Sequence, residues 1–238
     1  MIFEQKYRVS IEDVGLNDKV TSKALLSYLE DIACLHSNSV GFGPLNAKDS
    51  GFVWILLNWK VEIIKRVTYG EKILVRTWSR KYDKISAYRD FEMRDENDEL
   101  IARATSKWFL MDFNTRRPAR ITEEQIARYE SEPNRKVFED EIKKLIEPKE
   151  FESEMEYTVA RRDIDMNEHM HNLNYLDLAY EVLPEEVYRN EKLNNISIEY
   201  KKELKCGDRV KCVYSKIEEQ HVVTIKMDDK INAIVVLK

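Results

Sequence analysis

The chain has 238 residues, of which 43% are hydrophobic and 35% charged, and its formal net charge is −5 at pH 7. This negative charge argues against general nucleic-acid binding, which depends on a basic surface. No apolar run approaches the ~20 residues of a membrane helix, and Met1–Lys6 lacks the basic start and apolar stretch of a signal peptide, so we expect a cytoplasmic protein without a membrane partner.

The first half of the chain predicts a lead strand at Tyr7–Val9, one long helix and then antiparallel strands. Thr21 or Ser22 is suited to cap the helix and Gly41 to end it. Between them, apolar residues recur at steps of three and four and form one helix face. This face consists of Leu25, Leu26, Leu29, Ile32, Ala33 and His36. Alternating patterns around turns predict strands at Phe52–Val67, Glu71–Tyr82, Lys84–Arg94 and Leu100–Asp112.

The second half predicts the same order of elements. Its helix begins near Asn172 or Asn174 and ends before Pro184. Strands are expected at Ile196–Cys206, Asp208–Ile217, Val222–Met227 and Ile231–Leu237. A long helix wrapped by a curved antiparallel sheet is the hotdog type of α+β unit, so the sequence predicts a tandem, or double, hotdog.

The two halves also align residue by residue. Tyr7–Val20 matches Tyr157–Met170 at an offset of 150 residues, and Val61–Ile73 matches Ile198–Val210 at an offset of 137. Apolar positions match because both copies need the same core, whereas one imidazole and two acids occur only in the second copy. Asp165 faces Gly15, His169 faces Lys19 and Glu203 faces Arg66. We infer one working copy and one supporting copy, and we expect a positive φ at Gly15.

The repeat divides the chain into two domains. We expect an N-terminal domain at 1–130 without catalytic residues, a linker at 131–151 and a C-terminal domain at 152–238 that carries them. Thr122 and Gln125 have the spacing of a capping box and predict a short helix before the linker. The linker is rich in charges, and charge runs of this sort are usually solvated.

The segment Asp165–His169 offers the clearest chemistry. It precedes the second helix, and a loop that enters a helix directs side chains and free N–H groups toward one pocket. His169 can act there as a general acid or base, while Asp165 and Asn167 can fix its tautomer and bind an oxyanion. The alternative is that these residues only form a turn and that Asn172 or Asn174 caps the helix. The first copy keeps the turn without the acid and the imidazole, which favours a functional role for Asp165 and His169.

Glu203 and the cysteines are weaker candidates on the sequence alone. Glu203 stands in a predicted strand among lysines, where a glutamate usually faces solvent. The cysteines are odd in number and lack metal-type spacing, so we expect reduced thiols and no metal site. They are Cys34, Cys206 and Cys212. The sequence has neither a phosphate-binding Gly-rich loop nor a Gly-x-Ser-x-Gly elbow.

Motifs spread over nearly the whole chain occur together in one known family. In the first half they are Gly51–Trp54, Arg89–Phe91, Arg103–Trp108 and Thr115–Arg117. In the second half they are Asp163–His169, Asn172, Tyr175 and Glu199–Glu203. With these motifs the chain resembles the acyl-[acyl carrier protein] thioesterases of plants and bacteria.

The resemblance implies hydrolysis of an acyl thioester on acyl carrier protein to free fatty acid, which terminates fatty acid synthesis without a cofactor. The family's catalytic residues fall on Asp165, Asn167, His169 and Glu203, and Asn172 and Tyr175 are expected in the substrate site. Plant members carry a cysteine directly after the glutamate, but Leu204 stands here. A Cys–His–Asn mechanism is therefore excluded at this position, which leaves attack by water. The transit peptide and hydrophobic anchor of the plant enzymes are not seen in this sequence, so we expect a bacterial cytosolic relative.

We expect the acyl chain in the first half, between helix and sheet, with core packing as the competing explanation for each lining residue. The candidates are Leu25, Leu29, Trp54, Leu56 and Trp59. Carrier proteins are acidic and need a local basic patch. We prefer Lys201, Lys202 and Lys205 for this patch over Arg116, Arg117 and Arg120. An acyl-CoA thioesterase and a non-catalytic acyl-binding module are the alternatives, and a homodimer is left open.

Overall fold

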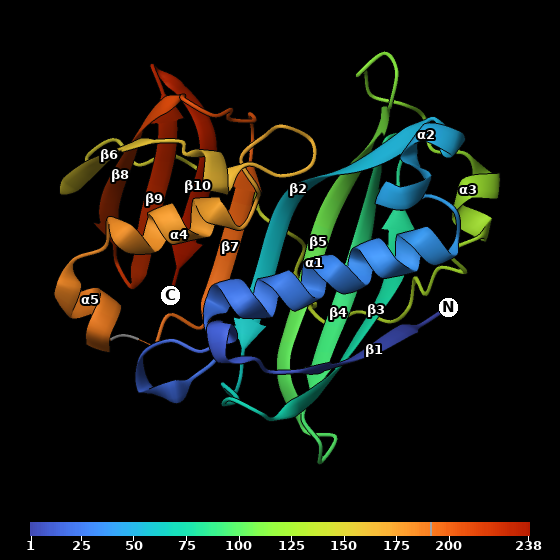
Figure 1. The fold of residues 1–238 in the computed structure, drawn as a ribbon, viewed down its shortest axis with the longest axis horizontal. Coiled ribbons are helices and arrows are strands. Elements are labelled where there is room, and N and C mark those ends of the chain that lie inside the picture. Colours follow the sequence, from blue (N-terminus) through green and yellow to red (C-terminus); the bar gives the residue numbers. More distant parts are fainter. Residues whose placement is uncertain (191) are drawn as a thin grey trace. The chain divides into compact units, whose positions relative to one another are not determined.

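The computed structural model describes residues 1–190 and 192–238, and the chain separates into two compact units, Met1–Ile142 and Lys143–Lys238 (Figure 1). Each unit consists of an antiparallel sheet with a helix against it. This is the hotdog arrangement, and the chain carries it twice in tandem, as the sequence predicts. Among residues 1–190 and 192–238, no helix has the length and apolar character needed to cross a membrane.

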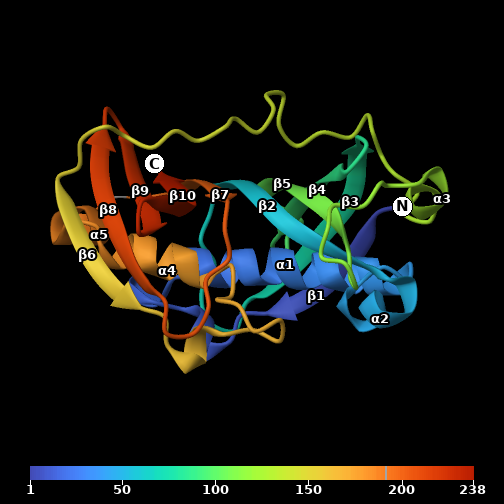
Figure 2. The ribbon, with the colours of Figure 1, turned by 90° about the horizontal axis from the view of Figure 1, so that it is seen from above.

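The N-terminal unit has the strand order β1-β3-β4-β5-β2, and all neighbours run antiparallel. Its strands are β1 (Phe3–Arg8), β2 (Phe52–Ile63), β3 (Lys72–Tyr82), β4 (Ser86–Arg94) and β5 (Leu100–Asp112). Its helices are α1 (Ser22–Ser39), α2 (Ala47–Ser50) and α3 (Glu123–Ala127). Figure 2 shows α1 running along one face of these strands.

Helix α1 begins and ends where its sequence predicts. The Oγ1 of Thr21 accepts a hydrogen bond from the N–H of Ala24 at 3.1 Å and caps the first turn. All six residues of the predicted apolar face are buried. Gly41 follows the helix with φ +85°, a conformation that glycine adopts without strain. Burial of this face against the sheet stabilises the N-terminal unit, since apolar burial contributes about 25 cal/mol per Å².

The C-terminal unit has the strand order β7-β10-β9-β8-β6, again antiparallel throughout. Its strands are β6 (Ser153–Thr158), β7 (Asn195–Tyr200), β8 (Arg209–Ile217), β9 (Gln220–Met227) and β10 (Lys230–Leu237). Its helices are α4 (Asn174–Glu181) and α5 (Glu185–Asn190). Helix α4 has 8 residues where α1 has 18, because the chain turns at Pro184 into α5.

Backbone hydrogen bonds confirm the repeat. Val20 donates to Val67 at 2.9 Å, and its counterpart Met170 donates to Leu204 at 2.7 Å. Gly15 donates to Lys19 at 2.9 Å, and Asp165 donates to His169 at 2.8 Å. The N–H of Thr21 donates to the carbonyl of Asp13, as that of His171 donates to Asp163. The N–H of Val9 donates to the carbonyl of Glu71, as that of Val159 donates to Asp208. The two loops therefore share one backbone fold and differ in the side chains they carry.

Two strands end earlier than predicted, at matching positions of the repeat. Strand β2 ends at Ile63 rather than Val67, and β7 ends at Tyr200 rather than Cys206. In the first copy the carbonyl of Ile101 accepts the N–H groups of Ile64 and Lys65. In the second, the carbonyl of Asn232 accepts those of Lys201 and Lys202, at 2.8 and 3.2 Å. Where one carbonyl accepts two successive N–H groups, the regular pairing of strands is interrupted, as it is at a β-bulge. Glu203 therefore lies in a loop after β7 and not in a strand.

The expectation of a positive φ at Gly15 is wrong. Gly15 has φ −111°, which other residues also adopt. A Cβ atom at this position would lie 3.0 Å from the Cγ2 of Thr21. Glycine is suited to this position because space is short, and its special backbone freedom is not used.

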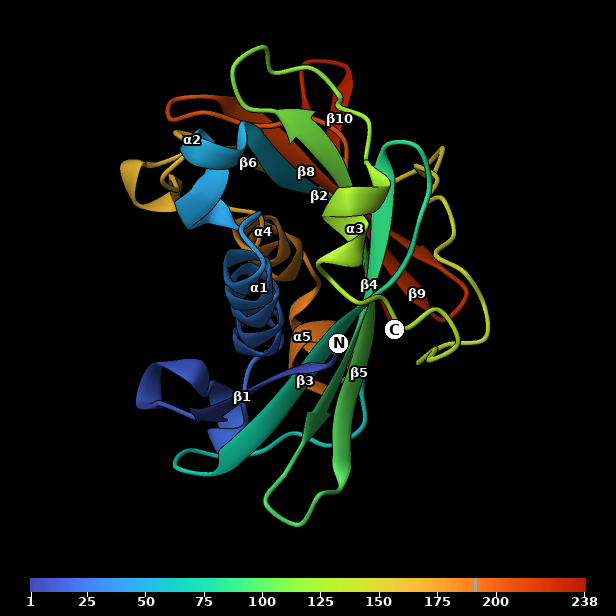
Figure 3. The same ribbon diagram turned by 90° about the vertical axis from the view of Figure 1, so that its right-hand side faces the viewer.

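Residues 131–142, which we call the strap, pack against the sheet of the N-terminal unit on the side opposite α1 (Figure 3). The Nε1 of Trp78 donates to the carbonyl of Arg135 at 2.9 Å, and the N–H of Val137 donates to Asp90 at 3.2 Å. The guanidinium of Arg103 donates to the carbonyl of Val137 at 3.0 Å. Main-chain atoms of the strap thus satisfy polar groups of β3, β4 and β5.

Candidate active site

The loop that precedes α4 is held by the carboxylate of Asp165. Its Oδ1 accepts the N–H groups of Asn167 at 2.8 Å and of His169 at 3.3 Å. Its Oδ2 accepts the Nδ2 of Asn167 at 3.4 Å. Glu168 completes the tight turn with φ 63°. The acid therefore fixes the shape of the turn from which His169 projects.

His169 meets Glu203 across the unit. The Nε2 of His169 lies 3.0 Å from the Oε2 of Glu203, and the two side chains are 12% and 55% exposed. The short loop after β7 brings Glu203 there, because Leu204 accepts the N–H of Met170, next to the histidine. All four predicted catalytic residues, Asp165, Asn167, His169 and Glu203, thus gather at one place in the C-terminal unit.

Asn172 lies just before α4, and Tyr175 lies in the first turn of that helix. Tyr175 is 3% exposed, and burial followed by the charge of Glu203 raises the pKa of its hydroxyl. Its hydroxyl donates to the carbonyl of Lys202 at 3.4 Å. The carbonyl of Asn172 accepts the hydroxyl of Tyr200 at 3.1 Å, while the N–H of Asn172 donates to none of the described residues. This N–H remains available to a ligand.

The other polar residues of this loop have local partners. The Nδ1 of His171 accepts the N–H of Leu173 at 3.2 Å, and the Nδ2 of Asn174 donates to the carbonyl of Asp163 at 3.0 Å. His221, in β9, is 1% exposed and its Nδ1 lies 2.9 Å from the hydroxyl of Tyr214. These three side chains support the unit rather than its site.

The environments of the three cysteines and of Leu204 bear on whether a thiol could be the nucleophile. Leu204, directly after the glutamate, is 0% exposed. Burial raises the pKa of the Cys34 and Cys212 thiols to about 12 each, whereas Cys206 is exposed. In the described part of the chain, no group of His, Cys, Asp and Glu side chains has the arrangement of a metal site.

The predicted docking lysines are not equivalent. Lys201 forms an ion pair with Glu199 at 2.7 Å. Lys202 and Lys205 are exposed, and neither forms an ion pair with a described residue. Free cations therefore remain on both sides of Glu203, although one of the three lysines is already neutralised.

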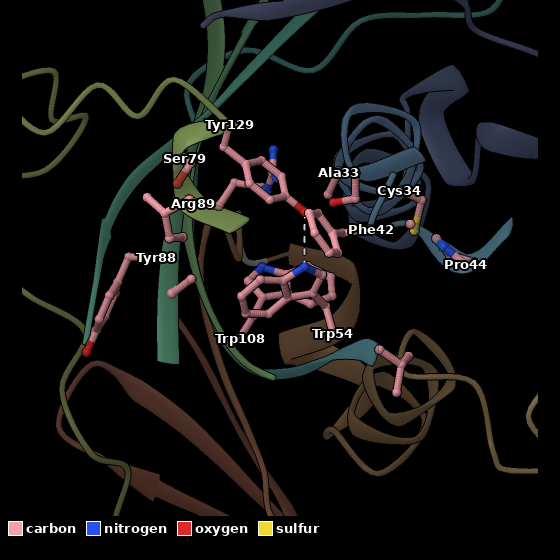
Figure 4. Close-up of a pocket in the computed structure, with 15 residues that line it drawn as sticks. Ala33, Cys34, Phe42, Pro44, Trp54, Ser79, Tyr88, Arg89, Trp108 and Tyr129 are labelled. Atoms are coloured by element: carbon pink, nitrogen blue, oxygen red, sulfur yellow. Dashed lines mark hydrogen bonds between the residues drawn. The ribbon is translucent and has the colours of Figure 1, made fainter. Parts of the chain in front are cut away.

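The N-terminal unit holds a cavity of its own, shown in Figure 4. It contains about 580 Å³ of space, part of it open to solvent. The Nε1 of Trp54 crosses it to donate to the hydroxyl of Tyr129 at 3.0 Å. The other large side chains of its wall are Phe42, Tyr88, Arg89 and Trp108. A wall rich in aromatic side chains is typical of small-molecule sites.

Of the acyl-lining candidates, Trp54 belongs to this cavity wall. Within the described residues, the remaining four are buried side chains outside the wall, with at most 3% exposure. They are Leu25, Leu29, Leu56 and Trp59. The sequence does not single out Arg89, Trp108 and Tyr129 as site residues. Arg89 and Trp108 belong to family motifs in two predicted strands, and Tyr129 follows a predicted short helix. Only the curvature of the sheet and the position of α3 bring them together.

The first copy of the catalytic loop carries no comparable group. Arg66, opposite Glu203 in the repeat, donates to the carbonyl of Val20 at 2.9 Å and to the hydroxyl of Ser22 at 3.0 Å. Lys19 replaces the histidine and is exposed. The two side chains thus supply positive charge and structural hydrogen bonds where the second copy has an acid and an imidazole.

Comparisons with known proteins agree with these features. The family model named acyl-ACP thioesterase N-terminal domain matches residues 1–129, and the model of the C-terminal domain matches residues 146–236. The chain is 29% identical over 240 residues to the chloroplastic oleoyl-acyl carrier protein thioesterase 2 of Arabidopsis thaliana, covering 93% of this chain and 65% of that protein. It is 29% identical over 224 residues to a chloroplastic palmitoyl-acyl carrier protein thioesterase of Cuphea hookeriana, covering 87% and 52%. The chain thus spans less than two thirds of the length of these curated relatives.

Solved structures show the same fold. An acyl-ACP thioesterase of Bacteroides thetaiotaomicron superposes with a TM-score of 0.88 at 21% identity, covering 99% of this chain and 96% of that one. The 12:0-ACP thioesterase of Umbellularia californica gives a TM-score of 0.88 at 21% identity, covering 100% and 96%. With both domain models matched in order along two hotdog units, the chain belongs to the acyl-ACP thioesterase family.

Proposed function

We propose that this protein hydrolyses acyl thioesters carried on acyl carrier protein and releases free fatty acid and carrier. The observation that carries the proposal is the contact between the Nε2 of His169 and the Oε2 of Glu203, 3.0 Å apart. Membership of the family and the names of the relatives support the substrate class. The conclusion is a reaction class, acyl transfer to water, with an acid–histidine pair in place of a covalent nucleophile.

Asp165 and Glu203 differ in the hydrogen bonds that their carboxylates already accept and in their exposure to solvent. Both oxygens of Asp165 already accept hydrogen bonds from the loop, so this carboxylate has little capacity left for water. Glu203 is 55% exposed and touches His169 with one oxygen. We therefore assign Glu203 as the general base that activates water, and Asp165 as the residue that positions His169 and Asn167.

In this mechanism Glu203 removes a proton from a water molecule while the water oxygen attacks the thioester carbonyl carbon. We assign the amide of Asn167 and the N–H of Asn172, which donates to no described residue, as donors to the resulting oxyanion. The carbonyl then re-forms as the C–S bond breaks, and the leaving thiolate takes up the proton that Glu203 removed from water, relayed through the contact with His169. The products are a carboxylic acid and the thiol of the carrier arm, so no cofactor is consumed.

The acyl chain and the carrier would use two further surfaces. We place the acyl chain in the cavity of the N-terminal unit, supported by its aromatic wall and by Trp54. We place the acidic carrier on Lys201, Lys202 and Lys205, mainly on the two that lack an ion-pair partner. Complementary charge steers association and sets partner choice more than it sets affinity.

Turnover assays with three substrates of equal acyl length test the proposal. We expect the highest kcat/KM with acyl carrier protein, a lower value with CoA and the lowest with pantetheine, because only the first presents a protein surface to the lysines. Glu203→Gln should lower kcat on all three by about a hundredfold or more. Equal kcat/KM for the carrier and CoA substrates would favour an acyl-CoA thioesterase. Binding without turnover would leave an acyl-binding module.

A further inference from the structure

Arg89, in β4, is a buried cation that no acid neutralises. It is 7% exposed and belongs to the wall of the N-terminal cavity, beside Tyr129 (Figure 4). Its Nη1 donates to the Nδ1 of His36 at 2.8 Å and to the Oγ1 of Thr77 at 3.2 Å. Among the described residues, no carboxylate lies within ion-pair distance of this guanidinium. Arg80, equally buried at 4%, lies 3.3 Å from Asp90.

The titratable neighbours of Arg89 are all uncharged near neutral pH. Burial, followed by the charge of Arg89, lowers the pKa of His36 to about 3. Burial raises the pKa of the Cys34 thiol to about 12 and also raises that of Tyr129. An arginine stays protonated in proteins. The cavity therefore contains one positive charge and no negative one.

The free edge of Arg89 has the geometry that carboxylates prefer. Nε and Nη2 donate no hydrogen bond to any described residue, and neither is among the polar atoms sealed from solvent. These two groups form the side-on edge of the guanidinium, whose parallel N–H bonds bind both oxygens of a carboxylate. The rest of the wall is largely apolar and aromatic, with Phe42, Val53, Trp54 and Trp108.

We propose that this cavity binds an alkyl carboxylate, with the carboxylate on the Nε–Nη2 edge of Arg89 and the alkyl chain against the aromatic wall. A buried charge without a counter-charge is costly, and a bound carboxylate supplies both the charge and two acceptors. The same chemistry can arrive from two sources. One is a free fatty acid, and the other is an acyl thioester whose far end carries a second carboxylate.

Equilibrium binding to the intact protein tests the site without any turnover. Decanoate and decanol are titrated while the fluorescence of the tryptophans is recorded, since Trp54 and Trp108 lie in the wall. We expect decanoate to bind at least tenfold more tightly than decanol. Arg89→Met should lower the affinity for decanoate to that for decanol. Arg89→Lys should retain part of the preference, because the positive charge remains while the two parallel N–H donors are lost. Arg80→Lys, a matched change at a buried arginine that has acid partners, should leave the preference unchanged.

Thioester hydrolysis separates the two sources. Decanoyl-pantetheine is compared with the same thioester bearing a terminal carboxylate, in the wild type and in Arg89→Met. A wild-type preference for the carboxylated chain that is lost in Arg89→Met identifies the substrate as the source. A preference confined to the binding titration identifies the free fatty acid.

Equal affinities for decanoate and decanol, with no preference between the thioesters, would overturn the proposal. If Arg89→Met does not fold, the wild-type ligand pair and Arg89→Lys still decide the result. If no thioester is hydrolysed, the proposed hydrolase function fails, while the binding titration still tests the carboxylate site.

Discussion

Asp165 and Glu203 both lie near His169, but their surroundings differ. Asp165 is held by its own loop, with Oδ1 on two backbone N–H groups. Glu203 contacts the imidazole and is otherwise open to solvent. An acid that shapes a loop can be replaced by any side chain that accepts the same hydrogen bonds. A carboxylate that removes a proton from water cannot be replaced in this way, because an amide does not take up the proton.

Two pairs of substitutions separate these roles. Asp165→Asn keeps an amide oxygen for the N–H groups of Asn167 and His169, so we expect a much smaller loss of kcat than in Asp165→Ala. Glu203→Gln should lose about as much as Glu203→Ala, at least about a hundredfold, because both lack the proton acceptor. Steady-state kinetics with melting curves measure the four variants. Similar losses in Asp165→Asn and Asp165→Ala would instead make Asp165 the base.

The thiols differ enough in environment to be told apart chemically. A thiolate forms only as the pH approaches the pKa, and burial raises that of Cys34 and Cys212 to about 12. At pH 8 we therefore expect iodoacetamide to modify Cys206 and to spare the other two, as measured by peptide mass spectrometry. Hydrolysis should survive this modification. Loss of activity that a Cys206→Ser variant prevents would revive a thiol mechanism.

At the scale of the elements, two copies of one loop share a backbone and differ in their side chains. In the first copy Arg66 donates to Val20 and Ser22, and a Cβ atom at Gly15 would lie 3.0 Å from the Cγ2 of Thr21. Restoring catalytic residues there would therefore disturb structure before it created chemistry.

The variant Gly15→Asp with Lys19→His tests this in a His169→Ala background. We expect no hydrolysis, because Arg66 still occupies the position of the acid. The melting temperature should fall, since the new Cβ would meet the methyl group of Thr21 at 3.0 Å, which is closer than an ordinary van der Waals contact. Lys19→His alone is the control and should melt like the parent. Measurable activity in the double variant would show that the two copies differ less than their side chains indicate.

Local devices could be predicted from the sequence because they need only neighbouring residues. The cap at Thr21 and the capping box of Thr122 and Gln125 are of this kind, and the structure confirms both. The ends of β2 and β7 could not be predicted, since the carbonyls that cause them belong to Ile101 and Asn232, on other strands. The same holds for the Arg89 cavity, whose wall comes from α1, β2, β3, β4, β5 and α3. The candidate catalytic set could be proposed from the sequence because three of its members share one short loop.

At the scale of the whole molecule, net charge and local charge point in opposite directions. The chain carries −5 overall, so the acidic carrier of the proposed function would need a local basic patch. Lys202 and Lys205 are candidates because they have no ion-pair partner among the described residues, whereas Lys201 has Glu199.

Charge reversal at Lys202 and Lys205 should raise KM for the carrier substrate several-fold and weaken its salt dependence. The acyl-pantetheine substrate should be unaffected, because it carries no protein surface. Arg116→Glu with Arg117→Glu is the matched control at the rival patch and should change little. The reverse pattern would move the docking surface to those arginines, and equal losses on both substrates would assign the lysines to the site itself.

The stability of the fold should depend on pH through His36. Its folded pKa is lowered to about 3, by burial first and Arg89 second, from the ordinary histidine value of 6.5. As the pH falls, His36 is protonated in the unfolded chain before it is protonated in the folded one. The free energy of unfolding therefore decreases as the pH falls below about 6.5. The slope from this group approaches about 1.4 kcal/mol per pH unit until about pH 3. Urea titrations at several pH values should show a flatter dependence for His36→Gln, and an unchanged slope would contradict the assignment.

The strap is held on its sheet by two kinds of contact, one through its main chain and one through its side chains. The carbonyl of Arg135 and both the N–H and the carbonyl of Val137 make the bonds, while the partner side chains belong to Trp78, Asp90 and Arg103. Strap side chains add ion pairs of Asp140 with Lys60 at 2.7 Å and of Glu141 with Lys81 at 2.9 Å. A strap whose acids are replaced would therefore keep its main-chain bonds and lose these ion pairs. Proline at position 137 would instead remove a main-chain bond, because proline has no N–H to give.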